Sequence, residues 1–219
     1  MNLPTTSDKS VSRKVRKTLF ALLLGGCAGF LGAMGVMSLT DGEALIGFDR
    51  SREIASLVGM LYVFTGIAMG LGVASPRAGA TFLNVEDAEE LQEQRVMLGY
   101  SALGLIAFGL ILPAAAFAAP VGPIPVTATM AVCAALLAIS VVLSLATWRR
   151  QDELMRATGL EGAAMSFYLL LLVGGGWSLL AHLEQVQAPA PLDWLTMIWA
   201  LVLLGCFVVM GRRGLLQMR

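Results

Sequence analysis

Long apolar runs constrain this chain more than any other feature of its sequence. They follow one another with short connectors between them, and each run is long enough for a helix to cross a lipid bilayer. The hydrocarbon core of a bilayer is about 30 Å thick, which an α-helix spans in about 20 residues. The runs lie at 18–39, 54–74, 98–119, 126–147, 163–183 and 192–210. We therefore predict six membrane-spanning segments.

The composition and the pattern of these runs predict the fold class. Hydrophobic residues make up 57% of the 219 residues, charged residues only 14%, and the mean hydropathy is +0.77. Lipid offers no hydrogen bonds, so a spanning backbone must pair internally, as a helix or a closed barrel. The runs lack the ten-residue alternation typical of barrel strands. We expect an all-α, polytopic helical bundle in a lipid bilayer.

The positions of the cations predict the orientation of the spans. Cytoplasmic loops of membrane proteins carry an excess of Lys and Arg. Only Arg50 and Arg52 lie on one set of alternating segments, and both termini belong to the other set. We therefore expect both termini in the cytoplasm and a multi-pass protein of a bacterial inner (plasma) membrane. The cations of the richer set are Lys9, Arg13, Lys14, Arg16, Lys17, Arg77, Arg95, Arg149, Arg150, Arg156, Arg212, Arg213 and Arg219.

These boundaries divide the chain into a membrane domain and two short tails. Residues 1–17 form a basic cytoplasmic tail, residues 18–210 the six-helix transmembrane domain, and residues 211–219 a second basic tail. The net charge is zero, so the composition does not indicate a nucleic-acid partner. The expected partners are the lipid bilayer and a membrane protein or a second copy of the chain.

The first run contains a possible cleavage signal. Residues 24–27, Leu-Gly-Gly-Cys, resemble a bacterial lipoprotein signal that would place a lipid on Cys27. However, the chain continues apolar to Leu39, whereas a lipidated N-terminus should continue as a polar tether. We expect the first segment to be retained as a span, with cleavage at Cys27 as the alternative.

Small residues at helical spacing predict close helix packing in the first two spans. Gly25 with Gly29, Ala28 with Gly32, and Gly66 with Gly70 each stand four residues apart. This spacing places both small residues on one helix face, where two backbones can approach closely. The pattern predicts tight contact between these spans, or between them and a partner.

Two spans carry residues that weaken a helix. They are Pro113 in the third span and the run Gly174, Gly175 and Gly176 in the fifth. Paired interruptions point to binding sites in transporters, where broken helices direct backbone groups at a substrate. Mild kinks and close packing are the ordinary alternative, because Gly and Pro are frequent in membrane helices.

The connector at 83–97 predicts an acidic amphipathic helix on the cytoplasmic side, continuous with the third span. Asn84 is a candidate N-cap, and carboxylates in a first helical turn interact well with the helix dipole. An acidic face suits a basic protein partner better than anionic lipid. Its candidate partner residues are Glu86, Asp87, Glu89, Glu90 and Glu93.

The connector before the fifth span adds Asp152, Glu153 and Arg156 to this surface. Both acids precede Arg156 at helical spacing, so we expect ion pairs that extend the fifth helix into the cytoplasm. With Leu154, Leu160 and Glu161, this arrangement resembles an element at the cytoplasmic start of helices in uncharacterised small bacterial membrane proteins. The whole chain resembles six-span bacterial inner-membrane proteins of similar layout. The resemblance implies an architecture and no activity.

Chemistry-bearing clusters are not evident in the sequence. No ionisable residue lies near the middle of a span, where one would indicate function. His182 is the only histidine, and Cys27, Cys133 and Cys206 lack metal-ligand spacing. We therefore predict no metal or cofactor, and we do not expect an enzyme, although that class stays open.

Two functions remain from different classes. The first is an accessory or interaction subunit of a membrane complex, which agrees with small-residue faces and an acidic cytoplasmic surface. The second is a transporter or channel for a small neutral or apolar solute, which would use the interruptions at Pro113 and Gly174–Gly176.

Overall fold

The computed structural model describes residues 49–75 and 88–214. Within these ranges the regular structure is helical, and five helices are long and apolar enough to cross a membrane. The all-α prediction is therefore confirmed for this part of the chain. The first predicted span, at 18–39, lies outside the described residues, and so do Gly25, Ala28, Gly29 and Gly32.

The first described helix, α2, runs over Arg50–Ala74. It begins at Asp49, whose carboxylate accepts a hydrogen bond from the backbone N–H of Arg52 at 3.0 Å. Such an N-cap satisfies one of the N–H groups that the first turn leaves without a partner.

A short helix, α4 (Ala88–Glu93), precedes α5 (Arg95–Ala116). The predicted continuous helix is wrong at this point, because the chain turns at Gln94 between the two. Gln94 has φ of −86° and ψ of 0°, a conformation typical of turns. Glu89 and Glu93 lie on α4, whereas Asn84, Glu86 and Asp87 lie outside the described residues.

Helix α6 runs over Val126–Trp148 and returns along α5. The loop at 117–125 between them contains Pro120, Pro123 and Pro125, which cannot donate backbone hydrogen bonds and so stop the helix. Two backbone hydrogen bonds close the loop, from Ala119 N to Ile124 O at 2.8 Å and from Ile124 N to Phe117 O at 3.2 Å.

The fifth predicted span belongs to a longer helical segment, Glu153–His182, of 30 residues. It consists of α7 (Glu153–Leu170), one turn of π-helix, η2 (Leu171–Gly175), and α8 (Gly176–His182). At 1.5 Å per residue it is about 45 Å long. It therefore exceeds the thickness of a bilayer core, and its excess length is accommodated by tilt or by projection at one end.

Helix α9 runs over Pro191–Arg212 and completes the described fold. Pro191 occupies the first turn, where its missing N–H costs nothing. The carboxylate of Asp193 accepts a hydrogen bond from the backbone N–H of Ala190 at 2.9 Å and so fixes the start of the helix.

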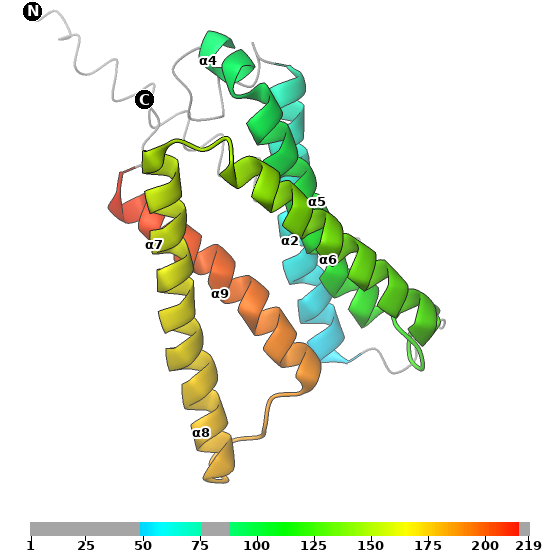
Figure 1. The fold of residues 1–219 in the computed structure, drawn as a ribbon. Coiled ribbons are helices and arrows are strands. Elements are labelled where there is room, and N and C mark those ends of the chain that lie inside the picture. Colours follow the sequence, from blue (N-terminus) through cyan, green and yellow to red (C-terminus); the bar gives the residue numbers. More distant parts are fainter. Residues whose placement is uncertain (1–48, 76–87, 215–219) are drawn as a thin grey trace, which may run out of the picture.

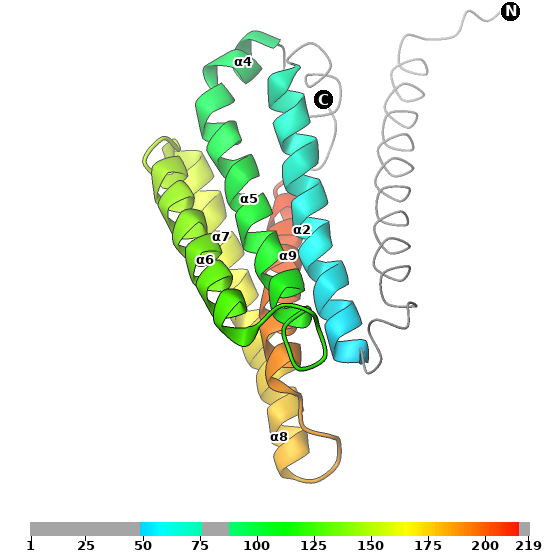
Figure 2. The same cartoon turned by 90° about the vertical axis from the view of Figure 1, so that its right-hand side faces the viewer.

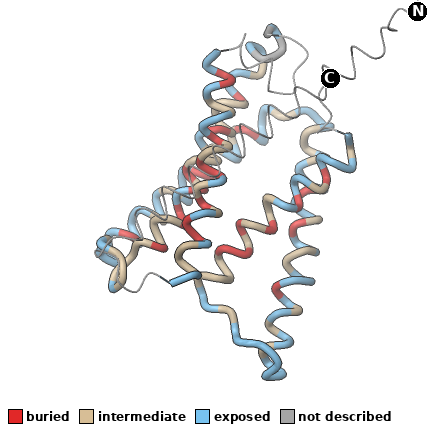
Figure 3. The backbone as a smooth tube through the Cα atoms, turned by 180° about the vertical axis from the view of Figure 1, so that it is seen from behind, coloured by how far each residue is buried: buried red, intermediate tan, exposed pale blue. Residues whose placement is uncertain are grey.

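The helices form two groups that meet at α9. Helix α5 lies between α2 and α6, while α7 lies against α9, and α9 also contacts α2 and α5 (Figures 1 and 2). Buried residues concentrate on α2, α5 and α9 (Figure 3). In the most apolar windows of α6 and of Glu153–His182 only 11% of the residues are buried, against 33% in α2. Helices α6 and α7 therefore keep most of their surface outside.

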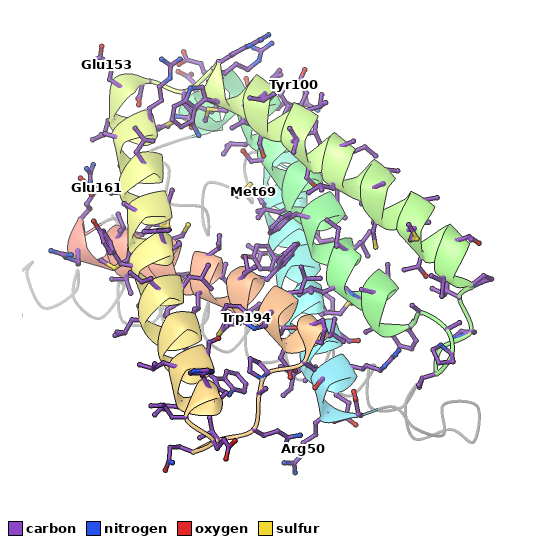
Figure 4. The ribbon with its side chains drawn as sticks, turned by 60° about the horizontal axis from the view of Figure 1, so that its bottom comes forward. Arg50, Met69, Tyr100, Glu153, Glu161 and Trp194 are labelled. Atoms are coloured by element: carbon purple, nitrogen blue, oxygen red, sulfur yellow. The ribbon has the colours of Figure 1, made fainter. Side chains whose placement is uncertain are left out.

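The arginines are distributed unequally between the two ends of the bundle. Figure 4 shows Tyr100 and Glu153 at one end and Arg50 at the other. We name the first the cation-rich end, because most of the described arginines lie there and only Arg50 and Arg52 lie at the opposite end. The arginines of the cation-rich end are Arg95, Arg149, Arg150, Arg156, Arg212 and Arg213.

Candidate functional site

Glycine brings the backbones of α2 and α5 into direct contact. A methyl group added at Gly59 would lie 2.6 Å from the carbonyl oxygen of Gly109, and one at Gly66 would lie 2.7 Å from that of Ala102. These distances are shorter than van der Waals contact, so only glycine fits. At Gly70 the nearest atom, the Cβ of Ala102, is 3.8 Å away, which leaves room for a methyl group. Of the predicted pair, Gly66 therefore makes the tight contact with α5.

Gly59 and Gly109 were not among the predicted packing residues. A sequence signal for Gly59 was present, since it stands seven residues before Gly66 and so shares its helix face. A signal of the same kind was present for Gly109, since Ala102 stands seven residues before it and Ala116 seven residues after it, and all three are small residues on one face of α5. Gly109 faces Gly59, and a methyl group there would lie 2.7 Å from the Gly59 carbonyl oxygen.

Three aromatic side chains connect α9 to α2 and α5. The Tyr62 hydroxyl donates a hydrogen bond to the Trp199 carbonyl oxygen at 2.7 Å. The Trp199 indole N–H donates to the Phe108 carbonyl oxygen at 3.0 Å, and the two rings stack with centroids 4.2 Å apart. Tyr62 and Trp199 are 3% and 7% exposed, and Leu112 beside them is fully buried. We name Tyr62, Phe108 and Trp199 the aromatic junction.

Helices α7 and α9 meet through a serine and a glycine. The Ser166 hydroxyl lies 2.7 Å from the Gly162 carbonyl oxygen on its own helix and 3.3 Å from the Val202 carbonyl oxygen on α9. A methyl group added at Gly205 would lie 2.3 Å from the Ser166 Oγ, so glycine is required opposite the serine. This contact holds α7 on α9 at a distance that a larger residue would not allow.

The two predicted helix interruptions lie against different helices. Pro113 stays inside α5, where its ring lies against Gly59 of α2. The glycine run contributes Gly174 and Gly175 to the π-helical turn η2, in which Gly174 faces Trp194 and Met197 of α9. A methyl group at Gly174 would lie 2.8 Å from the Trp194 ring. Side chains therefore fill the space beside Gly174.

Gly175 and Gly176 lie on the outer side of this turn. Gly175 is exposed, with only a Leu171 methyl carbon within 4 Å of an added Cβ, and Gly176 has nothing within that distance. Neither residue lines the pocket beside Glu161 and Arg213, the pocket beside Glu93 and Asp152, or the pocket beside Ser166 and Cys206. The structure thus separates the predicted solute-site residues rather than gathering them around one space.

Two of the predicted partner residues meet at the cation-rich end. Glu93 of α4 and Asp152 before α7 line a pocket of about 450 Å³ together with Arg150. The Arg150 guanidinium lies over the Tyr100 ring, 5.7 Å from its centroid. Glu89 and Glu153 are exposed at the same end of the molecule. Glu90 also belongs to α4, but its side chain is not among those that the structure describes.

The expected ion pairs of Arg156 with Asp152 and Glu153 are wrong. The Asp152 carboxylate instead caps α7 by accepting from the backbone N–H of Met155 at 2.6 Å. Arg156 donates from Nε to the Trp148 carbonyl oxygen at 3.2 Å, and its guanidinium lies 6.0 Å from the centroid of the Trp148 ring. Asp152 caps α7, and Arg156 binds the carbonyl of Trp148 at the C-terminal end of α6. Both interactions are preferred here to a surface ion pair, which contributes little to stability.

An ion pair that the sequence did not predict joins the middle of α7 to the C-terminal end of α9. Arg213 binds Glu161 through both carboxylate oxygens, at 2.5 Å and 2.9 Å, and donates to the Thr158 hydroxyl at 2.8 Å. The two residues are 52 apart in the sequence, so helical spacing gives no hint of the pair.

Arg52 has a structural role at the opposite end. Its guanidinium donates to the carbonyl oxygens of Ala116 and Ala118, the latter at 3.1 Å. Ala116 is the last residue of α5, where backbone acceptors lack helical partners and where the helix dipole favours a cation, and Ala118 lies just beyond it. Of the two described arginines at this end, Arg50 and Arg52, Arg52 therefore binds the C-terminal end of α5.

No group of three or more His, Cys, Asp or Glu residues that could hold a metal ion occurs among residues 49–75 and 88–214. His182 ends α8 and is exposed, and Cys133 and Cys206 are free thiols on α6 and α9.

Comparison with protein-family models, with curated proteins and with solved structures gives no match to this chain. The geometry is therefore the basis of a functional proposal. It consists of close small-residue contacts inside the bundle, large apolar side chains on the outside of α6 and α7, and a charged end.

The glycine contact between α2 and α5 predicts a sharp response to one methyl group. We expect Gly66→Ala to lower stability by about 1–3 kcal/mol, because the added Cβ overlaps the α5 backbone. Gly99→Ala is the matched control, since nothing lies within 4 Å of a Cβ there. Thermal unfolding in detergent measures both. Equal midpoints for the two variants would contradict the close backbone approach.

The aromatic junction predicts that the Tyr62 hydroxyl contributes to stability. Tyr62→Phe keeps the ring and removes the hydrogen bond to Trp199, at an expected cost of about 0.5–1.5 kcal/mol. Tyr168→Phe changes a tyrosine that is 65% exposed and should leave stability unchanged. Detergent unfolding curves followed by tryptophan fluorescence report the difference. A Tyr62→Phe variant as stable as the wild type would refute the role of this hydrogen bond.

Proposed function

We propose that this chain is an integral membrane protein with six spans and both termini in the cytoplasm, embedded in the inner membrane of a bacterium. Five long apolar helices support the membrane placement. The cation-rich end supports the orientation, because cytoplasmic loops are rich in Lys and Arg. In this arrangement α4, the start of α7 and the end of α9 face the cytoplasm.

Within the membrane, the chain acts as an accessory or interaction subunit of a larger complex. The observation that carries this proposal is the outer surface of α6 and α7, two helices joined by a short connector. The buried residues of α6 are Thr129, Ser140 and Thr147, and those of α7 are Gly162 and Ser166. Their large apolar side chains point outward, with Val142 64% and Leu172 of the adjoining η2 74% exposed.

Such surfaces suit a partner helix. Membrane helices associate through van der Waals contact and close fit, so an uncovered apolar face is available to another span as well as to lipid. At the cytoplasmic end, the pocket with Glu93, Asp152 and Arg150 adds polar groups of both signs that a partner's loop can recognise. A second copy of the chain is one possible partner.

A transporter or channel for a small neutral or apolar solute is the alternative function. It would need a water-accessible path at the depth of the η2 glycines. The side chains of Trp194 and Met197 lie against Gly174, and Gly175 is on the outside of the bundle, which favours the accessory role.

The accessory role predicts a companion protein that binds through the α7 face. After mild detergent extraction, native mass spectrometry should detect the full-length chain with a companion, or a second copy, at fixed stoichiometry. Leu172→Ala should weaken the affinity for the companion roughly fivefold, from the ~1 kcal/mol that truncation of a contact side chain costs. Leu71→Ala, which truncates a residue of α2 that is 63% exposed, is the control. A bare monomer, or equal loss in both variants, would contradict the proposal.

The same placement predicts that Gly175 faces lipid. In a variant with Cys27, Cys133 and Cys206 replaced by alanine, Gly175→Cys should resist a charged thiol reagent in membranes opened to both sides, and should react with an apolar maleimide. Ala188→Cys, in the exposed loop before α9, should react with both reagents. Rapid reaction of Gly175→Cys with the charged reagent would instead support a solute pathway.

A further inference from the structure

A pocket at the cation-rich end of α7 and α9 combines a charged mouth with an apolar wall. It measures about 430 Å³ and is lined by Glu161, Ala164, Met165 and Tyr168 from α7 and by Val209, Arg212 and Arg213 from α9. Figure 4 shows Glu161 beside the end of α9, on the outside of the bundle. None of these residues belongs to the pocket that contains Glu93 and Asp152.

The charges at the mouth of this pocket do not cancel. Glu161 and Arg213 neutralise each other, and Arg213 is held further by Thr158. Arg212 is exposed and has no hydrogen bond or ion pair within the described part of the chain. One guanidinium is therefore left to bind an anion, and its planar fork matches the oxygens of a phosphate.

The wall of the pocket becomes apolar with depth. Helix α7 runs from the cation-rich end into the predicted membrane, so Ala164, Met165 and Tyr168 lie progressively farther from that end than Glu161. Helix α9 runs the opposite way, which places Val209 one turn deeper than Arg212 and Arg213. A ligand that fits this surface has an anionic head and an apolar body.

The position of the pocket agrees with such a ligand. Arg212 is the last residue of α9, which is long and apolar enough to cross a membrane, so it is expected at the level where lipid headgroups meet water. Basic pockets between spans on the cytoplasmic side bind anionic headgroups.

We propose that this pocket binds an anionic phospholipid, with the phosphate on Arg212 and an acyl chain along Ala164, Met165 and Val209. The proposal depends on the membrane placement given above, but not on the presence of a companion protein. The bound lipid would lie in the outer groove between α7 and α9. It would thereby stabilise the contact between these two helices.

Titration of the delipidated, full-length protein with phosphatidylglycerol, read by native mass spectrometry, tests this proposal. The wild type should bind phosphatidylglycerol about tenfold more tightly than phosphatidylcholine, and Arg212→Gln should lose about tenfold in affinity for phosphatidylglycerol. Arg149→Gln removes an equal charge from an exposed residue at the end of α6 and should change the affinity less than twofold.

Three results would overturn the proposal. They are unchanged affinity in Arg212→Gln, equal loss in Arg149→Gln, and displacement of the lipid by millimolar inorganic phosphate, which would make the ligand a soluble phosphate. Because the companion appears in the same spectra as a separate mass, failure of lipid binding and failure of the accessory role are distinguishable.

Discussion

Close approach of helix backbones is the constraint on which this structure depends. Lipid chains are as apolar as leucine, so spans gain little by burying large apolar side chains against one another. They associate where small residues allow van der Waals contact and where polar groups find partners. In this chain Gly59, Gly66 and Gly109 allow α2 to touch α5, and Gly205 allows α9 to touch Ser166 of α7. On α6 and α7 the bulky side chains are correspondingly left on the outside.

Helix α9 connects the two groups, and Trp199 is the centre of that connection. Its carbonyl accepts from Tyr62 of α2, and its indole N–H donates to the Phe108 carbonyl of α5. Unpaired polar groups are expensive in an apolar interior, so these hydrogen bonds specify one alignment of α9 as well as stabilising it. The opposite face of α9 carries α7 through Gly205. Contacts to α9 thus determine the position of α7, and the outer faces of α6 and α7 remain available for a partner.

The long apolar helices were predictable from the sequence, whereas most of their contacts were not. Hydropathy reports length and burial in lipid, and the predicted segments from 54 to 210 coincide with described helices. The face that each helix presents depends on packing between residues far apart in the chain. The contact of Gly66 with α5, the Tyr62 to Trp199 hydrogen bond and the Arg213–Glu161 pair all join residues more than 30 positions apart.

Local competition explains the errors at the cation-rich end. Asp152 and Arg156 stand at ideal spacing for an ion pair, but each has a backbone partner that spacing rules do not weigh. The glycine run correctly marked an irregular helix, since η2 forms there, but the sequence could not show that Trp194 fills the space beside Gly174. The solute-site interpretation stays a prediction, and the space beside Gly174 is occupied by a side chain that is 20 residues away in the sequence.

The most direct test of this account is the side of the membrane on which each end of the bundle lies. In the variant without native cysteines, Glu153→Cys and Gln187→Cys place single thiols at exposed positions on opposite ends. In intact cells a membrane-impermeant maleimide should label Gln187→Cys at once and Glu153→Cys only after permeabilisation. The reverse pattern would invert the proposed orientation, and equal labelling of both in intact cells would show that the helices between them do not cross the membrane.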